Sequence, residues 1–392
     1  MRGGAFPAIS LAALVIAGGS SARPVLVGPS VLVGSAPTSR AHPGLPTGLF
    51  RVTPRGKVQT LLAGDVSPVS VAATGAAVGY PPDPHSRHLV LAASASRTVL
   101  PHAEAGGGCA ALSPDGSLVA YVTGTSSYVK PSRHLLYTRI QGTLWVAETA
   151  NLDRLRAVQA GSFATSECPQ WSPTGNRLAY FAQQAEPVWA LTVYDHGAVH
   201  VVANVRTPVP SAHDRSFAWS REGRLAYMRG RDLFVGTRRL GRQILNRLSP
   251  RATTEYNRAL AVSPNGRLVA ASFGFRTGIF RLDGTVARIT SGHLRDWSGN
   301  AGVLTNGLDG LIPTLFRVPV RGRVVALARH FKTPVVADPG GAWFAYALVA
   351  KKQLVFRRPN GSLLRTVRLA FVPEVVAAAG KGGRINYPHG SY

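Results

Sequence analysis

The stretch Leu112-Ser113-Pro114-Asp115-Gly116, continued by Leu118-Val119-Ala120-Tyr121, decides the fold class. Proline presets φ at the second position of a tight turn, and glycine accepts the positive φ that closes it. The residues on either side alternate between apolar and polar types, as a half-buried β-strand requires. The stretch therefore predicts a β-hairpin.

The same phrase returns along the chain, which makes it a repeat. Clear copies lie at 171–180, 219–227 and 262–270, and weaker ones at 73–80, 297–300, 338–346 and 380–387. A second hairpin follows each first one, as at 279–290 and 354–367. Two hairpins make a four-stranded unit of roughly 40 to 50 residues, which is the size of a propeller blade.

The Trp-Ser-Pro-Asp-Gly…Ala-Tyr phrase, with its second hairpin, resembles the WD-like repeats of TolB-type β-propellers over residues 48–387. The resemblance implies an all-β disc of four-stranded blades. We expect about eight blades, or six or seven if the weakest copies are decorations. The chain opens with a second-type hairpin (49–62) and ends with a first-type one (375–387). We therefore expect the two terminal hairpins to share one blade and close the ring without an open edge.

Composition and the first residues indicate an exported protein. With 45% hydrophobic and only 16% charged residues, the chain is not of the disordered class. Residues 1–22 have the pattern of a signal peptide: Arg2, an apolar run over 5–17, and Ser20 and Ala22 at a cleavage site. No segment reaches the ~20 apolar residues of a membrane-spanning helix. We expect a secreted monomer with a flexible lead-in (23–47) and one propeller domain (48–388).

The charge predicts an anionic partner. The formal net charge is +26, and 38 of the 44 basic residues are arginine. Such a surface attracts polyanions in a salt-dependent way. Export argues against nucleic acid, so a protein or an anionic envelope polymer is the expected partner.

The expected binding surface is one face of the disc. The Ser-Pro-Asp-Gly turns lie on one face, whereas the connections between blades and between the two hairpins of a blade lie on the other, where loops are free to vary. The longest insertion is 123–142. Arginine for bidentate contacts and tyrosine for stacking suit an anionic or sugar-bearing partner, although a longer strand pair is the alternative interpretation. The candidate binding residues are Tyr128, Lys130, Arg133, Tyr137 and Arg139.

Two further sets of residues leave alternatives open. Cys109 and Cys168 each precede the serine of their turn by four residues, so they occupy equivalent positions in neighbouring units; a disulfide and two buried thiols are both compatible with this. Four histidines fall in connections between blades, where they are either surface residues or ligands of a metal in the channel mouth. These are His102, His213, His293 and His330.

The motifs of a catalytic domain are absent from the sequence. It has no Gly-x-Ser-x-Gly elbow, no His-Glu-x-x-His and no phosphate-binding loop. Our leading hypothesis is a non-catalytic scaffold without a cofactor, since the TolB resemblance implies protein–protein interaction. The alternative is a metal-dependent propeller enzyme that acts on anionic sugars, similar to polyuronide lyases, or a lactonase.

Overall fold

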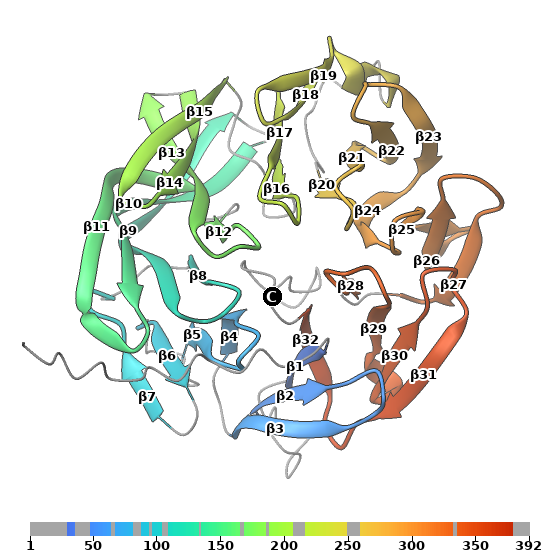
Figure 1. The fold of residues 1–392 in the computed structure, drawn as a ribbon, viewed down its shortest axis with the longest axis horizontal. Coiled ribbons are helices and arrows are strands. Elements are labelled where there is room, and N and C mark those ends of the chain that lie inside the picture. Colours follow the sequence, from blue (N-terminus) through green and yellow to red (C-terminus); the bar gives the residue numbers. More distant parts are fainter. Residues whose placement is uncertain are drawn as a thin grey trace, which may run out of the picture.

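The computed structural model describes residues 30–35, 48–63, 67–80, 88–93, 96–103, 109–132, 135–164, 168–185, 188–206, 216–248, 259–331 and 335–378. These residues form strands β1 to β32 and two short 3-10 helices. The strands make six four-stranded antiparallel sheets and one eight-stranded sheet that comprises two blades, all arranged around a common centre (Figure 1). The fold is a β-propeller of eight blades, as the repeat predicted.

Seven blades are built from consecutive strands, with the first strand of each nearest the centre (Figure 1). Blade 2 consists of β4 (Ser67–Val71), β5 (Ala77–Tyr80), β6 (Val90–Ala93) and β7 (Ser96–Val99). Blade 3 consists of β8 (Ala110–Leu112), β9 (Leu118–Ser132), β10 (Leu135–Glu148) and β11 (Asn151–Ala164). Blade 4 consists of β12 (Gln170–Trp171), β13 (Arg177–Ala185), β14 (Val188–Asp195) and β15 (Ala198–Arg206).

Blades 5 to 8 follow the same order and include both short helices. They are β16 (Phe217–Trp219), β17 (Leu225–Arg229), β18 (Asp232–Val235) and β19 (Arg238–Gly241), followed by η1 (Ile244–Arg247); β20 (Ala259–Val262), β21 (Leu268–Phe273), β22 (Arg276–Arg281) and β23 (Val286–Ser291); β24 (His293–Trp297), β25 (Gly302–Asp309), β26 (Ile312–Pro319) and β27 (Val325–Arg329); and β28 (Val335–Ala337), β29 (Phe344–Leu348), η2 (Val349–Lys351), β30 (Gln353–Arg357) and β31 (Leu363–Arg368).

Blade 1 joins the two ends of the chain, but not as two hairpins. Its order is β3 (Val58–Ala63), β2 (Gly48–Val52), β1 (Val31–Ser35) and β32 (Pro373–Ala378). Strand β1 lies inside the segment expected to be a flexible lead-in, and it takes the place expected for a strand at 385–387, which is outside the described residues. Val31, Leu32 and Val33 are buried, so their apolar run supplies the strand of this blade that lies between β2 and the inner strand β32.

The turns of the repeat close as their sequence predicts. In blade 3, the Gly116 amide donates to the Ser113 carbonyl at 2.9 Å, and the Leu118 amide donates to the Ser113 hydroxyl at 2.9 Å. Gly116 has φ +79°, which a side chain would strain. The serine thus satisfies an amide of the hairpin, which explains why it recurs. Equivalent glycine-to-serine bonds close the turns at Gly175, Gly223 and Gly266.

Neighbouring blades share their cores. The Trp171 indole donates to the Ala111 carbonyl of the preceding blade at 2.9 Å, and Trp219 repeats this contact with Gln170 at 3.0 Å. The recurring tryptophan therefore ties one inner strand to the next. The apolar clusters also span adjacent blades. Where the ring closes, Val33 and Phe50 of blade 1 pack with Phe356 of blade 8.

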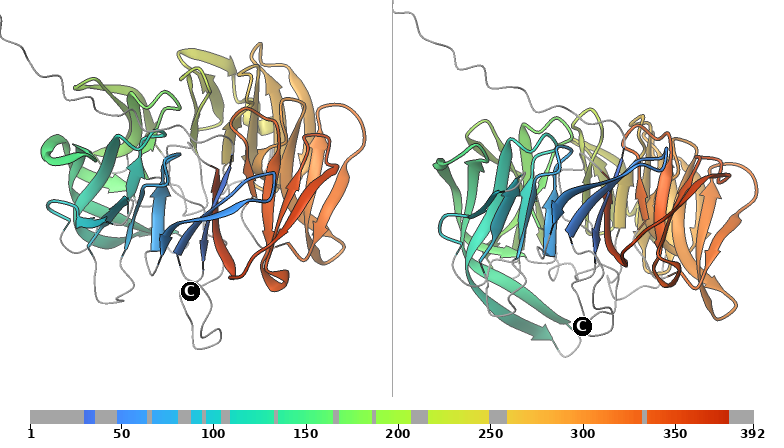
Figure 2. Two further views of the ribbon diagram at one scale, coloured as in Figure 1. Left: turned by 60° about the horizontal axis from the view of Figure 1, so that its bottom comes forward. Right: turned by 90° about the horizontal axis from the view of Figure 1, so that it is seen from below.

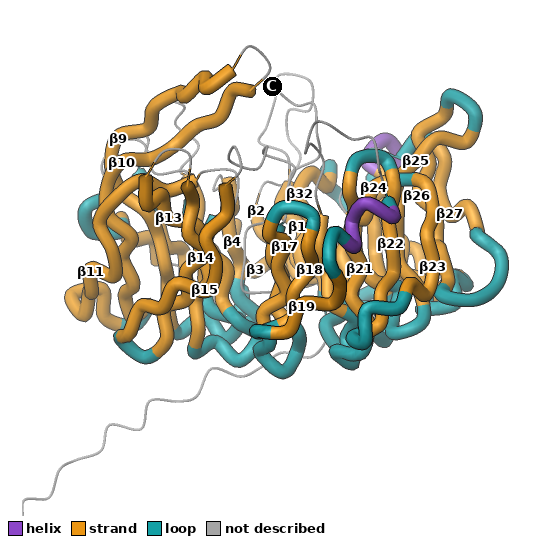
Figure 3. Tube along the Cα trace, turned by 90° about the horizontal axis from the view of Figure 1, so that it is seen from above, coloured by secondary structure: helices purple, strands orange, loops and turns teal. Residues whose placement is uncertain are grey.

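The disc has two faces that differ in their connections (Figure 2). We call turn face the one that carries the turns between the first and second strands of each blade. We call loop face the opposite one, which carries the second-to-third strand turns and the connections between blades. The end of the β9–β10 hairpin projects on the loop face (Figure 3).

Candidate functional site

The predicted insertion 123–142 is a β-hairpin that extends β9 and β10 beyond the blade (Figure 3). Thr123 pairs with Thr143, and Tyr128 pairs with Thr138. The chain therefore forms the longer strand pair that was the alternative to a loop. A ladder of backbone hydrogen bonds holds its two described strands together.

A row of glycines crosses the sheet at the base of this hairpin. Gly124 pairs with Gly142, which pairs in turn with Gly161 on β11. A Cβ on Gly142 would lie 1.8 Å from the Thr123 carbonyl oxygen, so only glycine permits this approach of the strands. Gly124 and Gly161 have φ of +140° and +148°. The row lets three strands bend together, and this bend sets the direction of the hairpin.

The predicted binding residues lie on or beside this hairpin. Tyr128 is 80% exposed. The Arg139 guanidinium donates to the Ser127 hydroxyl at 3.4 Å and to the Gln183 side chain of blade 4 at 3.3 Å. Arg139 therefore anchors the hairpin to the next blade. Lys130 and Tyr137 belong to β9 and β10, and Arg133 lies outside the described residues.

The predicted histidines are separated in the described part of the structure. His102 stacks on Trp145 with ring centroids 4.8 Å apart, and His293 lies beside Phe275 at 5.0 Å. His330 is exposed after β27, and His213 lies outside the described residues. Burial, and next the nearby Arg295, lower the pKa of His293. Among the described residues, no three His, Cys, Asp or Glu side chains form a group that could hold a metal.

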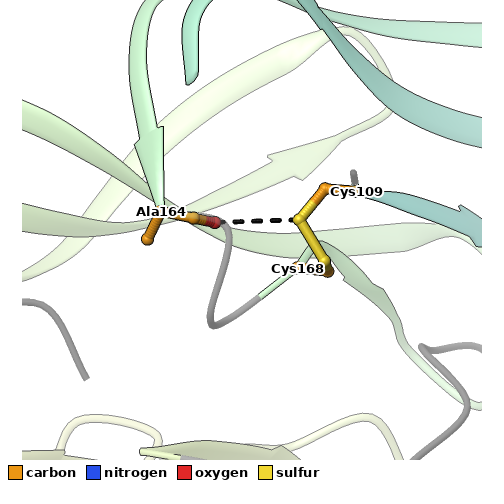
Figure 4. Close-up of a disulfide and its surroundings, with 3 residues drawn as sticks. All are labelled: Cys109, Ala164 and Cys168. Atoms are coloured by element: carbon orange, nitrogen blue, oxygen red, sulfur yellow. Dashed lines mark hydrogen bonds between the residues drawn. A yellow bond between two sulfur atoms is a disulfide. The ribbon is translucent and has the colours of Figure 1, made fainter. Parts of the chain in front are cut away.

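Cys109 and Cys168 form a disulfide between blades 3 and 4, with Cα atoms 5.1 Å apart. Each cysteine precedes the first strand of its blade, and both are buried beside Trp171 and Tyr180. The Cys109 sulfur lies 3.8 Å from the Ala164 carbonyl oxygen (Figure 4). A disulfide sulfur carries no proton, so this is a packing contact. The bond covalently links blade 3, which carries the hairpin, to blade 4.

A groove of about 570 Å³ opens on the turn face between blades 3 and 4. Its polar side chains have protein partners: Arg154 lies 3.3 Å from Glu148, Arg156 donates to the Tyr194 hydroxyl at 3.5 Å, and His196 lies 2.6 Å from Asp195, which is outside the lining. Trp171 forms part of its wall. No sequence pattern indicates this groove, because its lining comes from residues on and beside four separate turns.

The loop-face turns of blades 6 and 7 were not among the sites predicted from the sequence. They carry the exposed side chains Phe275, Leu308 and Leu311. The available signal was an apolar residue at the tip of a turn, a place where polar residues are usual.

Within the described residues, the structure has no helix with the length and apolar character needed to cross a membrane.

Comparisons with known proteins find solved structures with low similarity to the chain. No family model and no curated protein matches the chain. Solved structures similar to it include TolB from Acinetobacter baumannii, at 14% identity over 67% of each chain with a TM-score of 0.36. They also include the Cps50 (Swd1) β-propeller domain of Myceliophteria thermophila, at 16% identity over 71% of this chain and 95% of that domain, with a TM-score of 0.39. A Bacteroides fragilis protein provisionally assigned as a 6-phosphogluconolactonase is similar at 11% identity over 89% and 97% of the two chains, with a TM-score of 0.43. These similarities are low, and the fold rests on the strand pairing described above.

Proposed function

We propose that this protein is a secreted, non-catalytic binding scaffold that holds an anionic protein or envelope polymer on its loop face. The observation that carries the proposal is the β9–β10 hairpin with its exposed tyrosine. An aromatic side chain that is 80% exposed on a supported hairpin adds nothing to the core. Residues of this kind are typical of binding sites, where aromatic anchors contribute much of the affinity.

The rigidity of the hairpin supports the same proposal. Its base is fixed by the glycine row, its side by the contact between Arg139 and Gln183, and its blade by the disulfide. Val129 also packs against the core of blade 4. A preorganised surface loses little conformational entropy on binding, so more of the contact energy is retained as affinity.

The charge supports an anionic partner. The sequence has 44 Lys and Arg against 18 Asp and Glu. Several of the described carboxylates are occupied, as Glu148 is by Arg154 and Asp309 is by Arg329. The surplus positive charge speeds association with an acidic surface and weakens as salt screens it.

The test uses the full chain immobilised on a resin and incubated with the envelope fraction of its native host. We expect partner retention that fades as salt rises from about 0.05 to 0.5 M. Tyr128→Ser should lower the affinity for the retained partner by roughly tenfold. The matched control is Leu363→Ser on the outer strand β31, where an apolar side chain that is 53% exposed is removed away from the loop face.

Two results would contradict the proposal. One is retention that does not change with ionic strength. The other is a partner whose affinity is lowered equally by Tyr128→Ser and by the Leu363→Ser control.

A further inference from the structure

The loop face of blades 6 to 8 presents apolar side chains at the tips of its turns. Leu311 is 93% exposed, Phe275 76% and Leu308 65%. Phe275 lies between β21 and β22, and Leu311 lies in the two-residue link between β25 and β26. In blade 8, Val349 begins the short helix η2 at the equivalent turn.

The turns between the first and second strands, on the opposite face, have a different character. Residues near their tips are polar, so exposed apolar tips are not a general property of this propeller. These residues are Asp115, Asn176, Glu222, Asn265 and Asn300. The apolar tips therefore form a local feature of three consecutive blades.

Basic side chains also lie on the loop face, on blades 5 to 8. All five are exposed, and none forms an ion pair with a described carboxylate. The two carboxylates of the nearby turns are engaged, Asp232 with Arg239 at 3.5 Å and Asp309 with Arg329 at 2.8 Å. The basic residues are Arg229, Arg242, Arg247, Arg276 and Lys351.

The two sets of residues lie on one side of the disc. Figure 3 draws the β25–β26 turn and both short helices toward the face from which the β9–β10 hairpin projects. Phe275 is directly followed by Arg276, and Val349 is followed two residues later by Lys351. Each of these turns thus pairs an apolar side chain with a cation. We call the four apolar residues and the five basic ones together the docking patch.

We propose that the docking patch binds the surface of a phospholipid bilayer that carries anionic head groups. Phe275, Leu308 and Leu311 enter the boundary between head groups and acyl chains, while the arginines and Lys351 pair with lipid phosphates. This inference rests on the proposed function, because it assigns a second part of the same loop face to a partner of defined chemistry.

The shape of the patch favours a bilayer over a protein. The apolar side chains stand on turns from separate blades, so they project outward. A protein partner needs recesses with matching spacing, whereas a bilayer accepts apolar tips at any spacing. Phosphate groups supply the anions, and each cation near an anionic surface strengthens the attachment in a salt-dependent manner.

Insertion is tested with a fluorescent label at single positions. The chain has two cysteines, and both are in the disulfide, so an introduced cysteine is the only free thiol. Leu311→Cys labelled with an environment-sensitive fluorophore should shift to the blue on vesicles of phosphatidylglycerol and phosphatidylcholine. It should not shift on phosphatidylcholine alone. Leu363→Cys is the matched control and should not respond on either vesicle.

Affinity is tested by co-sedimentation of the full chain with the same vesicles. Replacing both Phe275 and Leu311 with serine should lower the partition coefficient by roughly tenfold or more. Arg276→Gln with Lys351→Gln should lower it by about tenfold, and added salt should remove this difference. Residues 1–22 are common to all variants, so their contribution cancels in the comparison.

The outcomes separate this inference from the proposed function. Tyr128→Ser should leave vesicle binding unchanged, since the hairpin is not part of the docking patch. The inference is overturned if the protein binds the vesicles without a spectral shift at position 311, or if the Phe275 and Leu311 double variant binds as well as the parent. It is also overturned if soluble polyglutamate, and not the vesicle, shifts the label. In each of these cases, Tyr128-dependent retention of a partner would still support the proposed function.

Discussion

Removing the bond between Cys109 and Cys168 should cost this propeller about 4 kcal/mol of unfolding free energy. The two cysteines are 59 residues apart in the sequence. In the chain-entropy model, a closed loop of about 60 residues restricts the unfolded chain by about 14 cal/mol/K, which is about 4 kcal/mol at 25 °C. Alanine is the replacement of choice, because both side chains are buried in an apolar cluster and burying a hydroxyl there would add a polar group to the core.

The single and double variants have a distinctive pattern. Either Cys109→Ala or Cys168→Ala breaks the bond and so loses the whole loop-closure contribution. The second substitution then adds only the cost of removing one buried sulfur, about 1 kcal/mol. The two effects are therefore expected to be strongly non-additive.

The assay is urea unfolding under non-reducing conditions, followed by the fluorescence of the six tryptophans. Each single variant should shift the midpoint by nearly as much as the double variant. The reasoning is refuted if the double variant lies within about 1 kcal/mol of the parent, or if the two single effects simply add.

Two other perturbations test the turns and the loop face. Gly116→Ala should destabilise the protein by at least about 2 kcal/mol, because φ is +79° and the new Cβ would lie 2.7 Å from the Thr74 hydroxyl oxygen. Gly310→Ala should cost only about 1 kcal/mol, because φ is +65° and no heavy atom lies within 4 Å of the new Cβ. Equal effects of the two substitutions in urea unfolding would contradict the packing argument. Burial lowers the pKa of His293 below its ordinary value of 6.5, so the unfolded chain takes up a proton before the folded one as the pH falls. Stability that depends on neutral His293 is complete above pH 6.5 and is lost below it. His293→Asn should therefore flatten the decline in melting temperature between pH 7 and 5. If His293→Asn has the same slope as the parent and as the exposed control His330→Asn, the assignment of this decline to His293 is wrong.

The propeller could be predicted from the sequence because its signal is local. The serine, proline and glycine of residues 112–121 specify one hairpin through bonds between near neighbours. Repetition of that hairpin then indicates the blade and its approximate number. Even the weak copy at 297–300 forms the turn of blade 7, since the Ser298 amide still donates to the Gly302 carbonyl.

The candidate site was predicted only in part, and the missing information is not local. The alternation of residues in 123–142 permits a strand pair, but whether it continues β9 and β10 depends on the glycine row shared with β11. The strand at Val31–Ser35 pairs with β2, which is close in the sequence, and with β32, which lies more than three hundred residues away. No pattern within 23–47 contains that pairing.

By itself, the sequence determined the turn chemistry, the four-stranded unit, the basic charge and the equivalence of the two cysteine positions. All of these depend on residues close together in the chain or on composition. Tertiary structure alone decided that β1 and β32 seal the ring, that the cysteines meet, and that the histidines of the described connections stay apart. It also brought Phe275, Leu308 and Leu311 to the same face as cations that form no ion pair with a carboxylate in the described part of the chain. The physical reason is that closing the ring fixes the direction of every blade, and this direction decides which distant turns share a surface.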